Sequence, residues 1–259
     1  LKAVVMGNKI REALEVEVPI AEIFTNQDIR SLSTYIQAAE QATFNKIPLA
    51  APREYYPLSS AQQRMYFLHA IDTASLAYNM PQRNWFAGGL ELAKIESVFQ
   101  QLIERHEMFR TTFHVIEDQP VQRVESSIDF TVDHYESEDE NINAIFQSFI
   151  RPFDLSRGPL IRAAIVDLPS TEQYLLLDMH HIISDGVSSM IMLDEFRSLY
   201  AGEELEPLAL QYKDFATWQN SEEQQAKITA QKVFWESEFA ELPAVLDLPT
   251  DFSRPLVKS

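Results

Sequence analysis

The chain has 259 residues, of which 46% are hydrophobic, and it carries a formal net charge of −18. This length and composition allow one or two domains with a real core, while the negative charge argues against a nucleic acid partner, whose phosphates would repel it. The absence of cysteine excludes disulfides and thiolate metal sites and favours a cytoplasmic protein. Because no apolar run reaches about 18 residues, we expect no membrane span.

The first 44 residues are predicted to form a small helical bundle. Apolar side chains recur at helical spacing over residues 4–14, Pro19 ends that pattern, and residues 20–24 form a short apolar segment. The sequence from Thr25 to Asp28 resembles a capping box that would begin a further helix. Helices this short are marginal alone, so we expect them to pack together.

Residues 45–56 are predicted to be a linker. Pro48, Pro52 and Pro57 fall close together, and no periodic pattern runs through them. The chain is therefore divided into residues 1–44, 45–56 and 57–259.

Helices and strands alternate in residues 57–259. Ser59 to Gln62 forms a second capping box, which starts a helix. Further helices are predicted at residues 92–106, 142–150 and 187–200, and strands at 84–87, 111–116, 121–124, 130–135, 160–166 and 174–179. The helix at 92–106 has an apolar side made of Ile95, Val98, Phe99, Leu102 and Ile103. The segment Asp118-Gln119-Pro120 is the expected hairpin turn. This alternation favours an α/β sandwich.

The candidate site directly follows the strand at 174–179. That strand reads Tyr-Leu-Leu-Leu-Asp-Met, as expected of a strand buried on both faces, and it leads into His180 and His181. Loops after central strands often hold the chemistry of an α/β sheet, and histidine titrates near neutral pH. Because neighbouring residues of a strand point to opposite faces, we expect one histidine in the core and one at a cleft. Gly186 is expected to permit a tight turn.

Two other kinds of site fit this segment less well. The spacing His-His-x3-Asp lacks a third His or Cys ligand for a metal. A serine hydrolase would need a Gly-x-Ser-x-Gly elbow, which the sequence does not contain. Ser184 and Ser188 are therefore interpreted as loop and helix-cap hydroxyls.

Four segments resemble one known family. Residues 180–186, His-His-Ile-Ile-Ser-Asp-Gly, match the HHxxxDG motif of the condensation-domain superfamily, which includes chloramphenicol acetyltransferase-like enzymes. Residues 59–68, 105–113 and 212–218 resemble three further motifs of non-ribosomal peptide synthetase condensation domains, in family order. The resemblance implies a chloramphenicol acetyltransferase-like α/β sandwich lobe, the first of two, preceded by a small all-α helical bundle fragment. Residues 235–255 resemble the crossover to the second lobe.

Residues 1–44 resemble the C-terminal part of a peptidyl carrier protein. In that family the serine that bears 4′-phosphopantetheine would stand just before Leu1. The resemblance implies that this cofactor is held on a carrier serine outside the sequence, and that the partners are upstream and downstream carrier domains and adenylation domains. With that serine and the second lobe outside it, we expect this chain alone neither to accept phosphopantetheine nor to form peptide bonds.

The resemblance implies amide formation, in which an acceptor amine attacks a donor thioester. It assigns catalysis to His181, as a base or as a group that positions the amine, and assigns supporting roles to His180, Asp185, Gly186 and Arg64. Asp185 is expected to pair with Arg64, and Gly186 to leave room for the pantetheine arm.

The remaining motif residues are expected to be structural. Arg105, His106 and Glu107 are expected to brace the sheet, and Tyr212 and Trp218 to pack rather than to touch substrate. The motif wording is similar to the subtype that joins an L-configured donor to an L-amino acid. Two alternatives stay open: an epimerisation domain of the same fold, and a domain that only docks carriers.

Overall fold

The structure is a computed structural model that describes residues 2–39, 47–139, 141–241, 243, 249 and 251–252. The chain divides into two compact units, residues 1–48 and 49–259. The division falls inside the expected linker at 45–56, of which residues 45 and 46 lie outside the described residues. Of the expected crossover at 235–255, residues 242, 244–248, 250 and 253–255 also lie outside them.

The described residues of the first unit form three helices around a very small core. They are α1 (Lys2–Leu14), α2 (Ile20–Thr25) and α3 (Ile29–Ala38). Its buried residues are Val16, Val18 and Ile23. The expected cap at Thr25 is wrong, because Asp28 accepts a hydrogen bond from the Ser31 backbone N at 2.9 Å and so begins α3, while Thr25 ends α2.

The second unit holds the remaining elements. In chain order they are β1 (Tyr56–Pro57), α4 (Ser60–Ile71), β2 (Gln82–Phe86), α5 (Leu92–Arg105), the 3₁₀ helix η1 (Glu107–Arg110), β3 (Thr111–Ile116), β4 (Gln119–Val124), β5 (Val132–Glu136), α6 (Asn143–Phe149), β6 (Ile161–Asp167), β7 (Gln173–Met179), α7 (Gly186–Ala201), α8 (Tyr212–Gln219) and α9 (Glu222–Glu238). The capping box at α4 forms both of its hydrogen bonds, as the sequence predicts.

The main sheet places β7 in its interior. Its strand order is β2-β7-β6-β5, with β5 and β6 parallel and the other neighbours antiparallel. The last five residues of β7, Leu175 to Met179, are all buried, in agreement with the expectation from their apolar sequence. A second sheet has the order β1-β4-β3.

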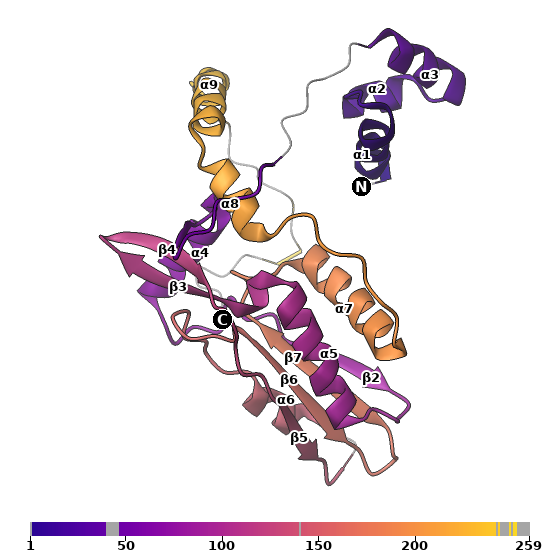
Figure 1. Cartoon of the computed structure of the whole chain (residues 1–259), viewed down its shortest axis with the longest axis vertical. Helices are drawn as coiled ribbons and strands as arrows, with labels where there is room; N and C mark the ends of the chain where they lie inside the picture. The colour runs from indigo at the N-terminus through magenta and orange to yellow at the C-terminus, as the bar shows by residue number, and fades with distance from the viewer. Residues whose placement is uncertain are drawn as a thin grey trace. The chain divides into compact units, whose positions relative to one another are not determined.

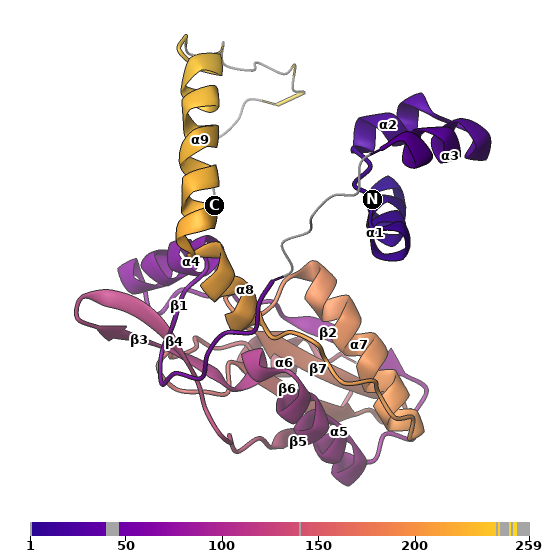
Figure 2. The ribbon, with the colours of Figure 1, turned by 45° about the horizontal axis from the view of Figure 1, so that its top comes forward.

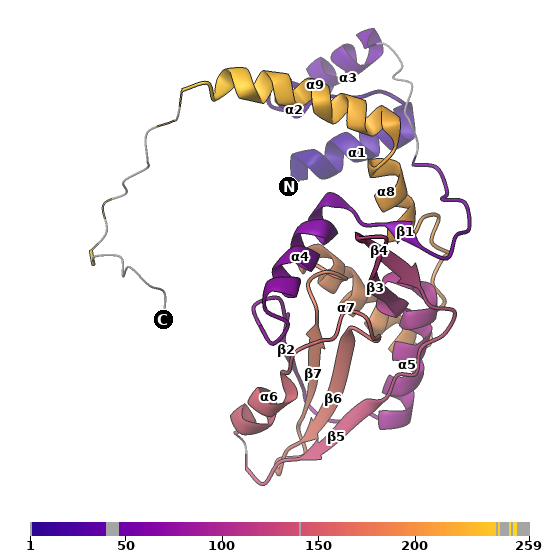
Figure 3. The ribbon, with the colours of Figure 1, turned by 90° about the vertical axis from the view of Figure 1, so that its left-hand side faces the viewer.

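Helices cover both faces of the main sheet (Figures 1 and 3). α5 and α7 lie side by side on one face, where the five predicted apolar residues of α5 are buried with Ala163 and Ile165 of β6. α6 covers the other face, where its Phe149 packs with Ala164 and Val166. Successive residues of β6 thus point to opposite faces, as the pleat of a strand requires. The α/β sandwich is confirmed.

The hairpin of β3 and β4 turns one residue earlier than expected. Glu117 and Asp118 have φ values of 50° and 60°, and Ile116 pairs with Gln119. A two-residue turn with positive φ at both positions matches the twist of the strands it joins. Gln119 and Pro120 therefore belong to β4 and not to the turn.

The last two described helices, α8 and α9, follow one another directly (Figure 2). No residue of α9 is buried against the described chain. Among the described helices, none combines the length and the apolar character needed to cross a bilayer.

Candidate active site

The candidate site is built where β7 ends and α7 begins. The backbone N of His180 donates to the Leu160 carbonyl at 3.0 Å, and that of His181 to the Tyr78 carbonyl at 2.8 Å. Asp185 then caps α7, because its carboxylate accepts from the Ser188 backbone N at 2.7 Å. The loop is therefore held at both ends.

His180 lies in the core. Its side chain is 2% exposed and is surrounded by the rings of His69, Tyr78 and Phe153. Its Nδ1 accepts a hydrogen bond from the Ile182 backbone N at 3.1 Å, which assigns the ring proton to Nε2. Burial, with the nearby His69 and His181, lowers the pKa of His180 to about 4. His180 is therefore neutral near pH 7.

An ion pair between buried Asp178 of β7 and half-buried Arg162 of β6 lies two residues before His180. Asp178 accepts from the Arg162 guanidinium at 3.0 Å and from Asn79 Nδ2 at 2.7 Å. Burial raises the pKa of Asp178, opposed by Asn79 and Arg162, and burial lowers the pKa of Arg162 to about 10. Sequence reasoning missed this pair, although a lone aspartate in an apolar strand signals that a partner is needed.

His181 lines a cavity of about 420 Å³. Its Nδ1 is buried without a hydrogen-bond partner among the described residues. The nitrogen available to a bound molecule is instead Nε2, which is not among the buried atoms and has no hydrogen bond within the described residues. The two adjacent histidines thus face different surroundings, as strand alternation predicts, while the catalytic role of His181 stays a prediction.

The cavity is formed by α4, η1, the 181–185 loop, α7 and residues 208–212. Its wall is mostly apolar, with Met65, Met108, Phe109, Ile191, Met192 and Leu210 among the lining residues. The polar lining residues include Gln62, His106, Glu195 and Tyr212.

The expected pairing of Asp185 with Arg64 is wrong. Arg64 is exposed on α4, and within the described chain no ion pair joins it to Asp185. The Asp185 carboxylate instead serves the start of α7, and the hydrogen bond from the Ser188 backbone N lowers the pKa of Asp185. The reason is local: an aspartate at an N-cap satisfies a free backbone donor of its own helix.

Gly186 does not serve a strained turn. It is the first residue of α7, its φ lies outside the left-handed region, and a Cβ placed there would meet no atom within 4 Å. The expected conformational need is therefore wrong, whereas the space beside Gly186 is open.

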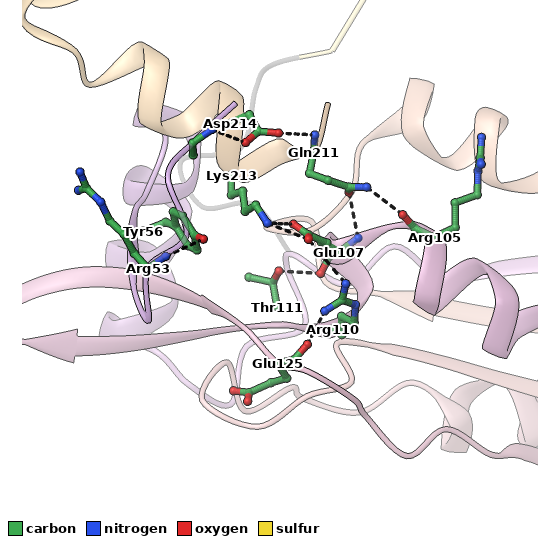
Figure 4. A network of polar contacts seen from close by, with 11 residues as sticks. Arg53, Tyr56, Arg105, Glu107, Arg110, Thr111, Glu125, Gln211, Lys213 and Asp214 are labelled. Atoms are coloured by element: carbon green, nitrogen blue, oxygen red, sulfur yellow. Dashed lines mark hydrogen bonds and ion pairs between the residues drawn. The ribbon is translucent and has the colours of Figure 1, made fainter. Parts of the chain in front are cut away.

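The motif at residues 105–113 is joined mainly to helices. Arg105 Nε contacts Glu195 of α7 at 3.2 Å, and His106 Nε2 binds the same carboxylate. Glu107 binds Lys213 of α8 at 2.7 Å, and its carbonyl accepts from Thr111 Oγ1 of β3 at 2.8 Å (Figure 4). The expectation that these three residues brace the sheet is therefore wrong for Arg105 and His106, whose side chains bind α7, while Glu107 also contacts a strand.

Gln211 fixes the wall at residues 208–212. Its side chain accepts from the Glu107 backbone N at 3.1 Å and donates to the Arg105 carbonyl at 2.9 Å (Figure 4). Trp218 packs against Phe215, as expected. Tyr212 both lines the cavity and hydrogen-bonds Ser59 Oγ at 2.9 Å.

The side chains around the cavity do not suggest a metal centre. In the part of the chain that the structure describes, no three His, Cys, Asp or Glu residues gather as metal ligands. The site is therefore a histidine beside an apolar cavity.

Known proteins resemble both the sequence and the fold. A family model described as "Condensation domain" matches residues 52–259. Gramicidin S synthase 2 of Brevibacillus brevis is 40% identical and bacitracin synthase 2 of Bacillus licheniformis 43% identical over 100% of this chain, which spans 6% and 10% of their lengths. The X-domain in the solved "Complex of the X-domain and OxyB from Teicoplanin Biosynthesis" matches with a TM-score of 0.70 and 24% identity, over 83% of this chain and 50% of that one. The chain therefore belongs to the condensation-domain family.

Proposed function

We propose that this chain is part of a non-ribosomal peptide synthetase and forms peptide bonds between two carrier-bound thioesters. The observation that carries the proposal is the position of His181, which lines the cavity with its Nε2 unbonded within the described residues, while His180 is held in the core. The long synthases to which the chain is similar support the same conclusion.

His181 acts on the attacking amine. The amine nitrogen bonds to the donor carbonyl carbon, the carbon–sulfur bond breaks, and the donor arm leaves as a thiol. A neutral imidazole accepts the proton that the amine loses, or hydrogen-bonds the amine so that it faces the carbonyl. Both roles use the same free side chain. Holding two tethered substrates together removes much of the entropic cost of their meeting.

Residues 1–44 are proposed to be the C-terminal part of a peptidyl carrier domain. The support is that the synthase relatives match this chain over its full length, beyond the condensation family match at 52–259. The cofactor would be 4′-phosphopantetheine on a carrier serine, and the partners would be carrier and adenylation domains. The open space beside Gly186 fits a narrow, uncharged pantetheine arm. An L-to-L subtype and a cytoplasmic location stay predictions.

The test is a product analysis with the synthetase that carries this chain. Donor and acceptor carriers are loaded with different L-amino acids, and the carrier-bound products are released and analysed by mass spectrometry and chiral chromatography. We expect an L,L-dipeptide on the acceptor carrier. A D-aminoacyl product without a dipeptide would identify an epimerisation domain instead, and unchanged substrates would identify a docking domain.

A further inference from the structure

The cavity beside His181 is larger and more apolar than contact with a reacting amine requires. Its volume of about 420 Å³ lies in the range of pockets that enclose small molecules. Three of its lining residues are methionines, Met65, Met108 and Met192, from three different elements. Methionine is unbranched and adapts to apolar groups of different shape.

The charged groups at the cavity already have partners. The Glu195 carboxylate is bound by Arg105 and His106, and its side chain is only 15% exposed. The Asp185 carboxylate caps α7 through Oδ1 and is exposed to solvent. Among the described lining residues, the half-buried Glu195 carboxylate is therefore not free to pair with a charged ligand. A charged side chain in this cavity would lose its hydration without compensation.

We propose that this cavity is a specificity pocket for the apolar side chain or acyl chain of one of the two thioester substrates. Seating that chain among the methionines brings the adjoining carbonyl or amine to His181. The proposal rests on the proposed function for its substrate. Both the donor and the acceptor thioester can carry an apolar chain, and the experiment below distinguishes which of the two the cavity binds.

The first measurement reports binding without any reaction. The full chain is labelled at its 7 methionine methyl groups and titrated with N-acetylleucinamide, with the corresponding aspartate amide as the charged probe. We expect the leucine probe to shift the signals of Met65, Met108 and Met192. Met190, on the same helix as Met192 but 67% exposed and outside the cavity, is the internal control. Equal shifts with the aspartate probe, or shifts at Met190 alone, would overturn the pocket.

The second measurement fills the pocket in the synthetase. Ala61 lines the cavity, whereas Ala70, on the same helix, is exposed outside it. Ala61→Phe should lower dipeptide formation with leucyl relative to alanyl substrate roughly tenfold, because pocket contacts of this size discriminate to that extent. Ala70→Phe should leave dipeptide formation unchanged with both the leucyl and the alanyl substrate. Varying the side chain of the donor and then that of the acceptor identifies which substrate the pocket binds.

Further outcomes distinguish a failure of the specificity pocket from a failure of the proposed peptide-bond formation. If Ala61→Phe does not fold, Ile191→Ala enlarges the same cavity, with Met190→Ala as its matched control. An equal loss with every side chain would overturn the pocket while leaving peptide-bond formation intact. If the wild-type synthetase makes no amide at all, the proposed function fails, and the methionine signals still decide whether the pocket binds apolar chains.

Discussion

The two sides of the end of β7 differ in how they use polar groups. On the core side, Asp178 and His180 are buried, Asp178 is paired with the half-buried Arg162, and the imidazole accepts a backbone hydrogen bond. On the cavity side, His181 Nε2 has no hydrogen bond within the described residues. His180, which stabilises the fold, is therefore adjacent in sequence to His181, which is available to a ligand. The contacts of His180 and Asp178 in the core hold His181 in place.

The largest expected effect is the loss of activity in His181→Ala. Dipeptide formation by the synthetase should fall by about 10²–10⁴-fold, because a positioned proton acceptor typically contributes that much. The melting temperature should change little, since His181 makes no side-chain hydrogen bond within the described chain. His180→Ala should act in the opposite way, mainly lowering the melting temperature. Near-normal turnover of His181→Ala would refute its catalytic assignment.

The core side should respond most strongly to loss of one buried charge. Asp178→Asn removes the charged partner of the half-buried Arg162 guanidinium, which keeps the Arg151 and Pro152 carbonyls, and should lower the free energy of unfolding by about 3 kcal/mol. Asp194→Asn is the matched control, because its 2.9 Å pair with Arg197 is solvent-exposed and should contribute about 1 kcal/mol or less. Urea denaturation followed by tryptophan fluorescence measures both. Equal losses would show that burial does not distinguish the two pairs.

The pH dependence of stability should isolate His180. Its pKa is about 4 in the folded chain against an ordinary 6.5, so its stabilising contribution is complete above pH 6.5 and is lost as the pH falls to about 4. The loss amounts to about 3 kcal/mol. His180→Phe removes this titration while His69 remains, so the stability difference between wild type and variant should shrink over that pH interval. A difference that is constant with pH would contradict a neutral, buried His180.

The smallest expected effect on stability comes from the cap of α7, on the cavity side. Asp185→Ala removes the cap of α7 and should cost about 1 kcal/mol above pH 4, a contribution that disappears as the pH falls through the lowered pKa of Asp185. Arg64→Ala, at an exposed position without an ion pair to Asp185, should change the urea midpoint very little. Matching losses in both variants would instead support the pairing that the sequence predicts.

Local patterns predicted most of the fold and the difference between the histidines. The apolar side of α5 and the capping box at Ser59 follow from spacing within one helix, and the opposite orientations of His180 and His181 follow from the pleat. The Arg162–Asp178 pair and the cavity wall at Gln211 were not predictable in this way. They join residues from different elements, and no local period encodes such contacts.

The cavity wall at residues 208–212 is held by contacts between residues far apart in the sequence. Gln211 and Glu107 are 104 positions apart, and Tyr212 and Ser59 are 153 apart. Closing loops of this length costs entropy before any contact forms, so we expect the wall to assemble late in folding. Gln211→Ala should then accelerate unfolding with little change in the folding rate, which stopped-flow kinetics would measure. Until that last step, a folding chain would contain His181 after a finished strand but no pocket around it.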